Sequence, residues 1–348
     1  MIDYTNCNID LVSAHHVGNK TNGEDLFIAK TPIDISNPLL RELLVKYFLS
    51  AFTSPEMYSF TFSNEDFSLN PIFNFVTRIF DVRQEFHINS INLAKHLYET
   101  SLHPNIKEGD FYVVFFSHIM FEGSFISATG FFKSENKQPF LKLVPENDGY
   151  SLQYEDGINI EKMDKGCLVL DVDRKEGFKV MIVDKSNKTD AQYWRDGFLK
   201  IKPVADEYHN TNNFLALTKK FVTGRLPEEM SIEKADQIDL LNRSVSYFKN
   251  NERFDKVGFE EEVFVDKGLI QSFQKFEKQY VNENDIEIAD DFDISAPALK
   301  KHARAFKSVL KLDKNFHIYI HGDRELIKKG IDPNTGKKFY QIYYDEET

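Results

Sequence analysis

Cysteine, tryptophan and long apolar runs are all scarce in this chain of 348 residues, which has two cysteines and one tryptophan. Cys7 and Cys167 stand far apart, so we expect two separate thiols in a reducing compartment rather than a disulfide. No stretch approaches the ~18 apolar residues of a membrane span, so we expect no membrane partner. The opening MIDYTNCNID has acidic and amide residues where a secretory leader needs cations and an apolar run. The expected location is therefore the cytoplasm.

Motifs for catalysis, metals and cofactors are also missing. Residues 330–338 read GIDPNTGKK, which has the wrong spacing for a phosphate-binding loop and lacks its Ser or Thr. His317 and His321 lie in an expected strand, where four residues span about 13 Å, too far to share one metal ion. The acidic run 290–293 lacks the glycine and the final glutamate of a calcium loop. We therefore expect no catalytic residues, no metal site and no cofactor, although scattered carboxylates leave a cryptic metal site open.

What is present indicates a globular α+β protein of two domains, 1–205 and 206–348. Apolar residues make up 41% of the chain and charged residues 28%, which is typical of a packed domain. In the first domain, apolar periodicity predicts helices over 38–49, 71–80 and 88–101. From residue 109 on, β-branched and aromatic runs predict strands, including a hairpin over 167–183. These elements predict a mostly antiparallel sheet with its helices on one face.

The second domain is expected to be mainly helical and to end in a small hairpin-like β unit. Two amphipathic helices are predicted over 231–250 and 268–281, followed by a polar linker or exposed edge over 282–293. Ser295 then caps a helix that we expect to continue to about residue 312. The remaining expectations are a strand over 316–322, a helical turn over 324–329, a turn over 332–336 and a strand over 337–344.

Charge is distributed unevenly along this acidic chain. The whole sequence carries −12, which argues against a generic DNA-binding protein. Residues 298–338, however, hold eleven basic and four acidic residues, a local charge of +7. The preceding window, 252–293, holds 13 acidic and five basic residues, a local charge of −8. The basic window is therefore the candidate for contact with a polyanion.

Helical spacing gives this window a pattern. Within the expected helix 295–312, Leu299, Ala303, Phe306 and Leu310 form an apolar stripe, and a cationic stripe follows one residue on. Such a helix can pack one face and follow a phosphate backbone with the other. A solvated helix face, or pairing with the acidic segment 252–293, would give the same pattern. The candidate nucleic-acid-binding residues are Lys300, Lys301, Arg304, Lys307, Lys311, Lys314, Arg324, Lys328 and Lys329.

Several segments carry a resemblance to a known family. They are HHVGNK (15–20), INLAKHLYETSLHPNIKEGDFYV (91–113), KGCLVLD (165–171), DKSNKTDAQYW (184–194), ADQIDLLNRSV (235–245) and FKSVLKLDKNFHIYIHGDRELIKKG (306–330). Through them the chain resembles bacterial nucleoid-associated proteins of the NdpA-like family. The resemblance extends over nearly the whole sequence, and its last segment is the most specific.

This resemblance implies a non-enzymatic protein of the cytoplasmic nucleoid that binds double-stranded DNA without strong sequence preference. It supplies no catalytic residues and does not define DNA contacts, so the basic window remains an inference from charge. Two alternatives stay open. One is an adaptor whose acidic surface binds DNA-processing proteins, and the other is a metal-dependent nuclease. Further nucleoid proteins and a second copy of the chain also remain open as partners.

Overall fold

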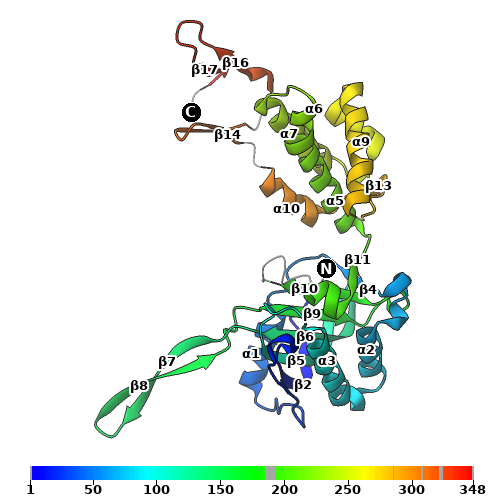
Figure 1. Ribbon diagram of the computed structural model, residues 1–348, viewed down its shortest axis with the longest axis vertical. Coiled ribbons are helices and arrows are strands. Elements are labelled where there is room, and N and C mark those ends of the chain that lie inside the picture. The colour runs from blue at the N-terminus through cyan, green and yellow to red at the C-terminus, as the bar shows by residue number, and fades with distance from the viewer. Residues whose placement is uncertain (1, 185–192, 285, 307–308, 321–323, 347–348) are drawn as a thin grey trace. The chain divides into compact units, whose positions relative to one another are not determined.

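The computed structural model describes residues 2–184, 193–284, 286–306, 309–320 and 324–346 of the chain. The chain falls into two compact units, unit 1 (Met1–Val204) and unit 2 (Ala205–Thr348), which are described separately below. Unit 1 contains a large antiparallel sheet, and unit 2 is mainly helical with small hairpins (Figure 1). The predicted α+β class is therefore confirmed.

The sheet of unit 1 is centred on β5 (Gly109–Phe121) and β6 (Ser124–Ser134). Glu122 and Gly123 join them in a tight turn, and both have positive φ, as two-residue hairpin turns commonly require. Every described strand pair in this sheet is antiparallel. The strand order is β11 (Ile201–Pro203), β4 (Tyr58–Phe60), β10 (Lys179–Asp184), β9 (Lys165–Leu170), β6, β5, β2 (Asn8–Val17) and β3 (Leu26–Phe27), with β1 (Ile2–Asp3) also paired to β5. The pairing of β9 with β10 confirms the predicted hairpin.

Both faces of this sheet are buried. Along β5, Phe111, Val113 and Phe115 belong to one core, whereas Val114 and Phe116 belong to the core on the opposite face. Because successive residues of a strand point to opposite faces, a strand buried on both sides must be apolar throughout. This explains the unbroken run FYVVFF at residues 111–116.

The helices of unit 1 cover both faces. α2 (Pro71–Asp81) and α3 (Phe86–Thr100) pack on the first, and α1 (Pro38–Leu49) packs on the second. α1 and α2 each begin with an asparagine that accepts backbone N–H groups, followed by a proline at the first helical position. The three predicted helices are confirmed. The prediction that all helices share one face is wrong, because the second face is equally apolar and needs its own cover.

One hairpin of unit 1 stands apart from the main sheet. β7 (Gln138–Glu146) and β8 (Gly149–Gly157) pair with each other over their full lengths and form a separate two-stranded sheet. In Figure 1 this hairpin extends away from the rest of unit 1. We call it the β7–β8 arm.

Unit 2 is a helical domain around an aromatic core. Its helices include α5 (Glu207–Lys220), α6 (Leu226–Glu229), α7 (Lys234–Asn250), α8 (Lys256–Phe259) and α9 (Lys267–Asn284). Phe214, Phe254 and Phe273 are fully buried in this core. The amphipathic helices predicted over 231–250 and 268–281 are confirmed as α7 and α9.

A short strand corrects the predicted linker over 282–293. Asp291–Asp293 forms β13 and pairs with β12 (Arg253–Asp255), while α9 extends to Asn284. Phe292 of β13 is buried, and its ring stacks on that of Phe254 with centroids 4.6 Å apart. Phe292, together with Ile288, thus attaches a mostly polar segment to the core of unit 2.

The C-terminal part of unit 2 departs most from expectation. α10 (Ala296–Ala305) ends at Ala305, and β14 (Val309–Leu312) pairs with β15 (Phe316–Tyr319), so the prediction of a helix to residue 312 is wrong. The predicted helical turn over 324–329 is limited to Arg324–Leu326, because β16 (Ile327–Ile331) begins at once and pairs with β17 (Lys338–Ile342). Val309 and Leu312 are compatible with a strand as well as with a helix, and pairing with β15 selects the strand.

The two cysteines are free thiols, as predicted. Cys167 is fully buried, and this burial raises its pKa well above the usual range. Burial and the nearby Asp10 charge raise the pKa of Cys7 to about 12. A thiol with a raised pKa is a poor nucleophile at neutral pH, so neither cysteine suits covalent catalysis.

Candidate nucleic-acid interface

The two C-terminal hairpins, β14–β15 and β16–β17, are held to α7 by a small apolar core. Leu310, Ile320 and Ile327 are buried together with Ile238 of α7. Asn242 of α7 also donates a hydrogen bond to the carbonyl of Ile320 at 3.2 Å. The hairpins are therefore fixed to a long helix, which gives the side chains on their outer surfaces a defined position.

Arg324 reinforces this attachment. Its Nη2 lies 3.0 Å from Glu233 Oε2, and its Nε lies 2.6 Å from Asp236 Oδ1. Its Nη1 donates to the carbonyl of Ile327 at the start of β16. The guanidinium of Arg324 therefore makes its hydrogen bonds within unit 2 and has few N–H groups available to bind a phosphate. Lys329 lies near the same cluster, with its Nζ 3.9 Å from Glu233 Oε1.

Other lysines of the hairpins point to solvent. Five of them are exposed and, among the described residues, have no carboxylate at ion-pairing distance. They are Lys311, Lys314, Lys328, Lys337 and Lys338. We call these five residues the hairpin lysines. Lys314 lies in the turn between β14 and β15, where Asp313 has a positive φ of 51°. Lys337 closes the turn before β17 and accepts from the Asp332 N–H through its carbonyl. Lysines at hairpin turns are accessible to a large polyanion.

Aromatic side chains accompany these cations. Lys328 Nζ lies 5.3 Å from the centroid of the Tyr343 ring, within the range of a cation–π contact. Phe339 lies across Gly330 of the paired strand, and a Cβ added at Gly330 would stand 2.3 Å from its ring. Phe316 and Tyr344 are also exposed. Exposed rings of this kind can stack on the bases of a single strand, whereas a duplex would be contacted by the cations through its phosphates.

The cationic stripe predicted on one helix does not exist as a unit. Lys300 and Arg304 lie on α10, Lys311 lies on β14, and Lys307 lies outside the described residues. Lys300 and Lys301 are exposed, and Lys301 Nζ lies 5.7 Å from the Tyr208 ring of α5. The structure therefore divides the candidate cations between α10 and the two hairpins.

α10 is attached to α5 rather than to the hairpins. Its N-terminal Ser295 N–H donates to Thr211 Oγ1 at 3.0 Å, and His302 Nε2 lies 3.0 Å from Asn212 Oδ1. Burial lowers the pKa of His302 to about 4, assisted by the charges of Lys301 and Lys219. His302 is therefore neutral at physiological pH and adds no charge to this surface.

The described ion pairs of the acidic segment 252–293 lie within that segment. Its Arg253 pairs with Asp291 at 2.8 Å, and its Lys256 pairs with Glu277 at 2.7 Å and with Asp290 at 3.1 Å. Where the chain is described, no ion pair joins this segment to residues 298–338. Pairing between the two segments, one of the alternative explanations of the charge pattern, thus finds no support in these contacts.

A buried charged cluster in unit 1 escaped the sequence reasoning. Lys133 and Lys165 stand opposite each other on β6 and β9 and are almost fully buried. Lys133 Nζ lies 3.2 Å from Glu135 Oε1, and Lys165 Nζ lies 3.0 Å from Asp184 Oδ1. Burial lowers the pKa of Lys133, and the Glu135 charge opposes this effect. Each cation has its own carboxylate, and the Lys165–Asp184 pair joins β9 to β10. No sequence motif marks it, because its members lie on separate elements.

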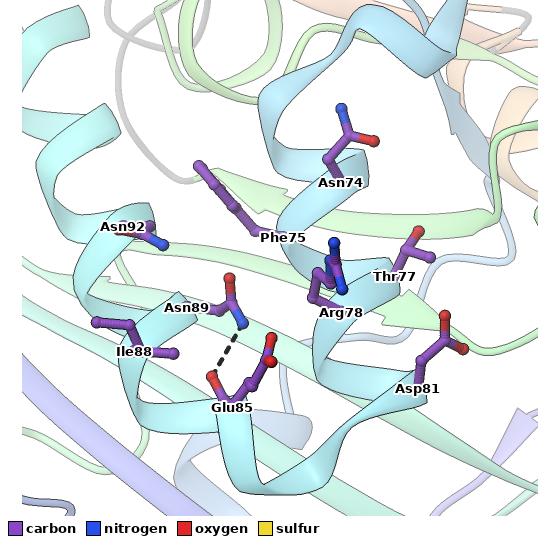
Figure 2. A pocket seen from close by; sticks show the side chains of 9 residues that line it. All are labelled: Asn74, Phe75, Thr77, Arg78, Asp81, Glu85, Ile88, Asn89 and Asn92. Atoms are coloured by element: carbon purple, nitrogen blue, oxygen red, sulfur yellow. Dashed lines mark hydrogen bonds between the residues drawn. The ribbon is translucent and has the colours of Figure 1, made fainter.

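Unit 1 also has a shallow groove of about 860 Å³ between α2 and α3, shown in Figure 2. Arg78, Asp81 and Glu85 lie along it with several amides, and Asn89 donates to the Glu85 carbonyl at 2.9 Å. The hydroxyl of Thr77, which lines the groove, donates a hydrogen bond to the Phe73 carbonyl at 2.8 Å rather than to a side chain that could act as a general base. The groove therefore presents no activated nucleophile.

In the ranges that the structure describes, no group of three His, Cys, Asp or Glu side chains is arranged to hold a metal ion. Among the described helices, none has the length and apolar character needed to cross a membrane.

A family model described as NA37, nucleoid-associated protein YejK, matches residues 13–348, nearly the whole chain. No curated protein matches the sequence.

Proposed function

Because the chain belongs to the family of nucleoid-associated protein YejK, we propose that it binds double-stranded DNA without sequence preference through its C-terminal hairpins. Membership of this bacterial family places the protein in the nucleoid, within the cytoplasm. The proposal adds the mode of attachment, which is direct contact between phosphates and the hairpin lysines.

The observation that carries the proposal is the set of five exposed hairpin lysines on a surface fixed to α7. A cation that is already paired within the protein gains little binding free energy from a phosphate. A lysine without such a pair releases a condensed counterion from the DNA when it binds a phosphate, and this release favours binding. Lys300 and Lys301 on α10 are exposed and can support the contact. Arg324 is better explained as an anchor, since two carboxylates and a carbonyl accept its hydrogen bonds.

The chemistry of these residues favours binding without sequence preference. Lysine is a flexible point charge, which suits phosphate, whereas the bidentate reading of a base edge usually relies on arginine or an amide. The overall charge of −12 would repel DNA from other surfaces and orient the approach toward the basic hairpins. An acidic protein can therefore bind DNA at one restricted site.

A second candidate function, an adaptor for DNA-processing proteins, is favoured by exposed carboxylates of unit 2. Glu261, Glu262 and Asp266 lie between α8 and α9, and all three are exposed. A basic protein partner could bind there while DNA stays on the hairpins. The proposed role is non-enzymatic in both cases.

A titration of pure protein against a labelled duplex at two salt concentrations tests the main proposal. We expect binding that weakens steeply with salt and does not depend on duplex sequence. Capture of a partner protein in the absence of DNA binding would favour the adaptor instead. Incubating plasmid with the pure protein and Mg²⁺ or Mn²⁺ tests the nuclease alternative, which predicts cleavage.

A further inference from the structure

The β7–β8 arm has one apolar face that the described residues of unit 1 leave exposed. In an antiparallel pair, residues directly opposite each other share a face. Leu141 is opposite Tyr154, Leu143 is opposite Leu152, and Pro145 is opposite Tyr150. Leu141, Leu143, Tyr150, Leu152 and Tyr154 are between 61% and 73% exposed. The arm therefore presents a continuous apolar strip along its length.

The other face of the arm is more polar. It carries Lys142, Ser151, Gln153 and Glu155 together with Phe140 and Val144, and Lys142 Nζ lies 3.3 Å from Glu155 Oε1. In β8 the alternation is complete from Tyr150 to Glu155, as is typical of a strand with one buried and one solvated face. The sequence of the arm is thus that of a half-buried sheet, although its apolar side is exposed in the described part of unit 1.

An isolated two-stranded hairpin is at best marginally stable in water, so the arm needs a partner surface. At ~200 Å² for a fully exposed Leu or Tyr, five side chains about two-thirds exposed present on the order of 650 Å². A specific protein interface buries about 800 Å² on each partner. The apolar strip alone approaches that size.

The charge of the arm narrows the choice of partner. Residues 138–157 contain one lysine and four acidic residues, Glu146, Asp148, Glu155 and Asp156. This local charge of −3 repels DNA and anionic lipid headgroups. The three opposed pairs of the strip carry no charge themselves. Glu146 and Asp148 lie at the tip of the arm and Asp156 near its base, so two strips can meet along their uncharged centre with these carboxylates at the rim. A twofold dimer requires such self-complementarity.

A second exposed apolar patch lies beside the base of the arm. Leu39, Leu40 and Leu43 of α1 are exposed, and α1 shares its core with Ile158 and Ile160, which directly follow the arm. Lys46 of α1 also pairs with Glu161. The strip and this patch together bring the exposed apolar area to that of a stable homodimer interface.

We propose that the apolar face of the β7–β8 arm is a dimerisation surface, covered in solution by a second copy of this chain. The proposal is independent of DNA binding, since the arm belongs to unit 1 and the hairpin lysines belong to unit 2. Dimerisation would place two DNA-binding surfaces in one particle and raise its avidity for DNA.

The molar mass of the full chain, measured by light scattering after size exclusion, tests this proposal. We expect twice the 40.5 kDa chain mass for the natural sequence. The double variant Leu143→Lys with Leu152→Glu places opposite charges on directly opposed positions. The new cross-strand ion pair stabilises the hairpin, while the apolar strip becomes polar. Its mass should fall by half.

A matched control changes the neighbouring pair on the other face, Val144→Lys with Ser151→Glu, which are also directly opposed. This control should remain dimeric. Circular dichroism and melting temperature establish that both variants fold, and an arm shortened to a turn between Gln138 and Gly157 provides a second monomeric form. A natural chain that is monomeric at every concentration, or a strip variant that stays dimeric, would overturn the proposal. So would a monomer whose strip is occupied by lipid or by an unrelated protein.

Discussion

Replacing Lys337 and Lys338 with glutamine should flatten the salt dependence of DNA binding. If all five hairpin lysines contact phosphates, the slope of log affinity against log salt is about −0.9 per contact, or about −4.5. Raising the salt from about 50 to 200 mM should then weaken binding about 500-fold. The double variant retains three contacts, for which the slope is about −2.7 and the same change weakens binding about 40-fold.

Fluorescence anisotropy of a labelled duplex at several salt concentrations measures these slopes directly. The matched control is Lys275→Gln with Lys278→Gln on α9, which removes the same charge from two exposed lysines of the same unit. Its slope should stay near that of the natural protein, because these residues lie in the acidic segment. Equal slopes for all three proteins would refute the assignment of phosphate contacts to the hairpins. Equal flattening in both variants would show that overall charge, rather than this surface, governs binding.

Three further predictions concern the framework that supports this surface. Arg324→Gln should destabilise the C-terminal hairpins by about 1–2 kcal/mol, because partly exposed charge-assisted hydrogen bonds are lost. Amide hydrogen exchange over Ile327–Ile331 should then become faster, and unchanged exchange would contradict the anchoring role. Burial, aided by the His87 charge, lowers the pKa of His15 to about 4, so the unfolded chain binds a proton there between pH 6.5 and 4 while the folded chain does not. Stability should therefore fall as the pH drops through that window, by up to about 1.4 kcal/mol per pH unit for this group, and urea unfolding of His15→Asn should show a weaker dependence. Asn70→Ala should cost about 2–3 kcal/mol in thermal unfolding, because Asn70 caps α2 and donates to the buried carbonyl of Leu199 at 2.9 Å; a loss below 0.5 kcal/mol would contradict this reading of the cap.

Elements governed by local signals could be read from the sequence. α1 and α2 start where an asparagine precedes a proline, because side-chain capping and a fixed φ act within a few residues. The turn between β9 and β10, and the periodicity of α7 and α9, are equally local. The family resemblance was also accessible, since it depends on the order of residues alone.

The sequence was ambiguous where the same residues fitted both the apolar spacing of a helix and the alternation of a strand. Leu310 continues the helical spacing of Leu299, Ala303 and Phe306, yet it also alternates with Leu312 as a strand requires. Pairing with β15 and burial beside Ile238 of α7 decide for the strand. The predicted four-cation stripe failed for the same reason, because it depended on one helix continuing to residue 312.

The sequence by itself determined how many cations the C-terminal segment carries and how acidic the rest of the chain is. It could not determine which of these cations are free, because an ion pair depends on residues brought together from distant positions. Arg324 meets Glu233 and Asp236 across nearly ninety positions of sequence, whereas Lys337 and Lys338 remain exposed. The alternation of Leu141, Leu143, Leu152 and Tyr154 was likewise present in the sequence. Only the tertiary structure shows that these side chains are exposed in the described part of unit 1, because burial is a property of the folded surface and not of the pattern.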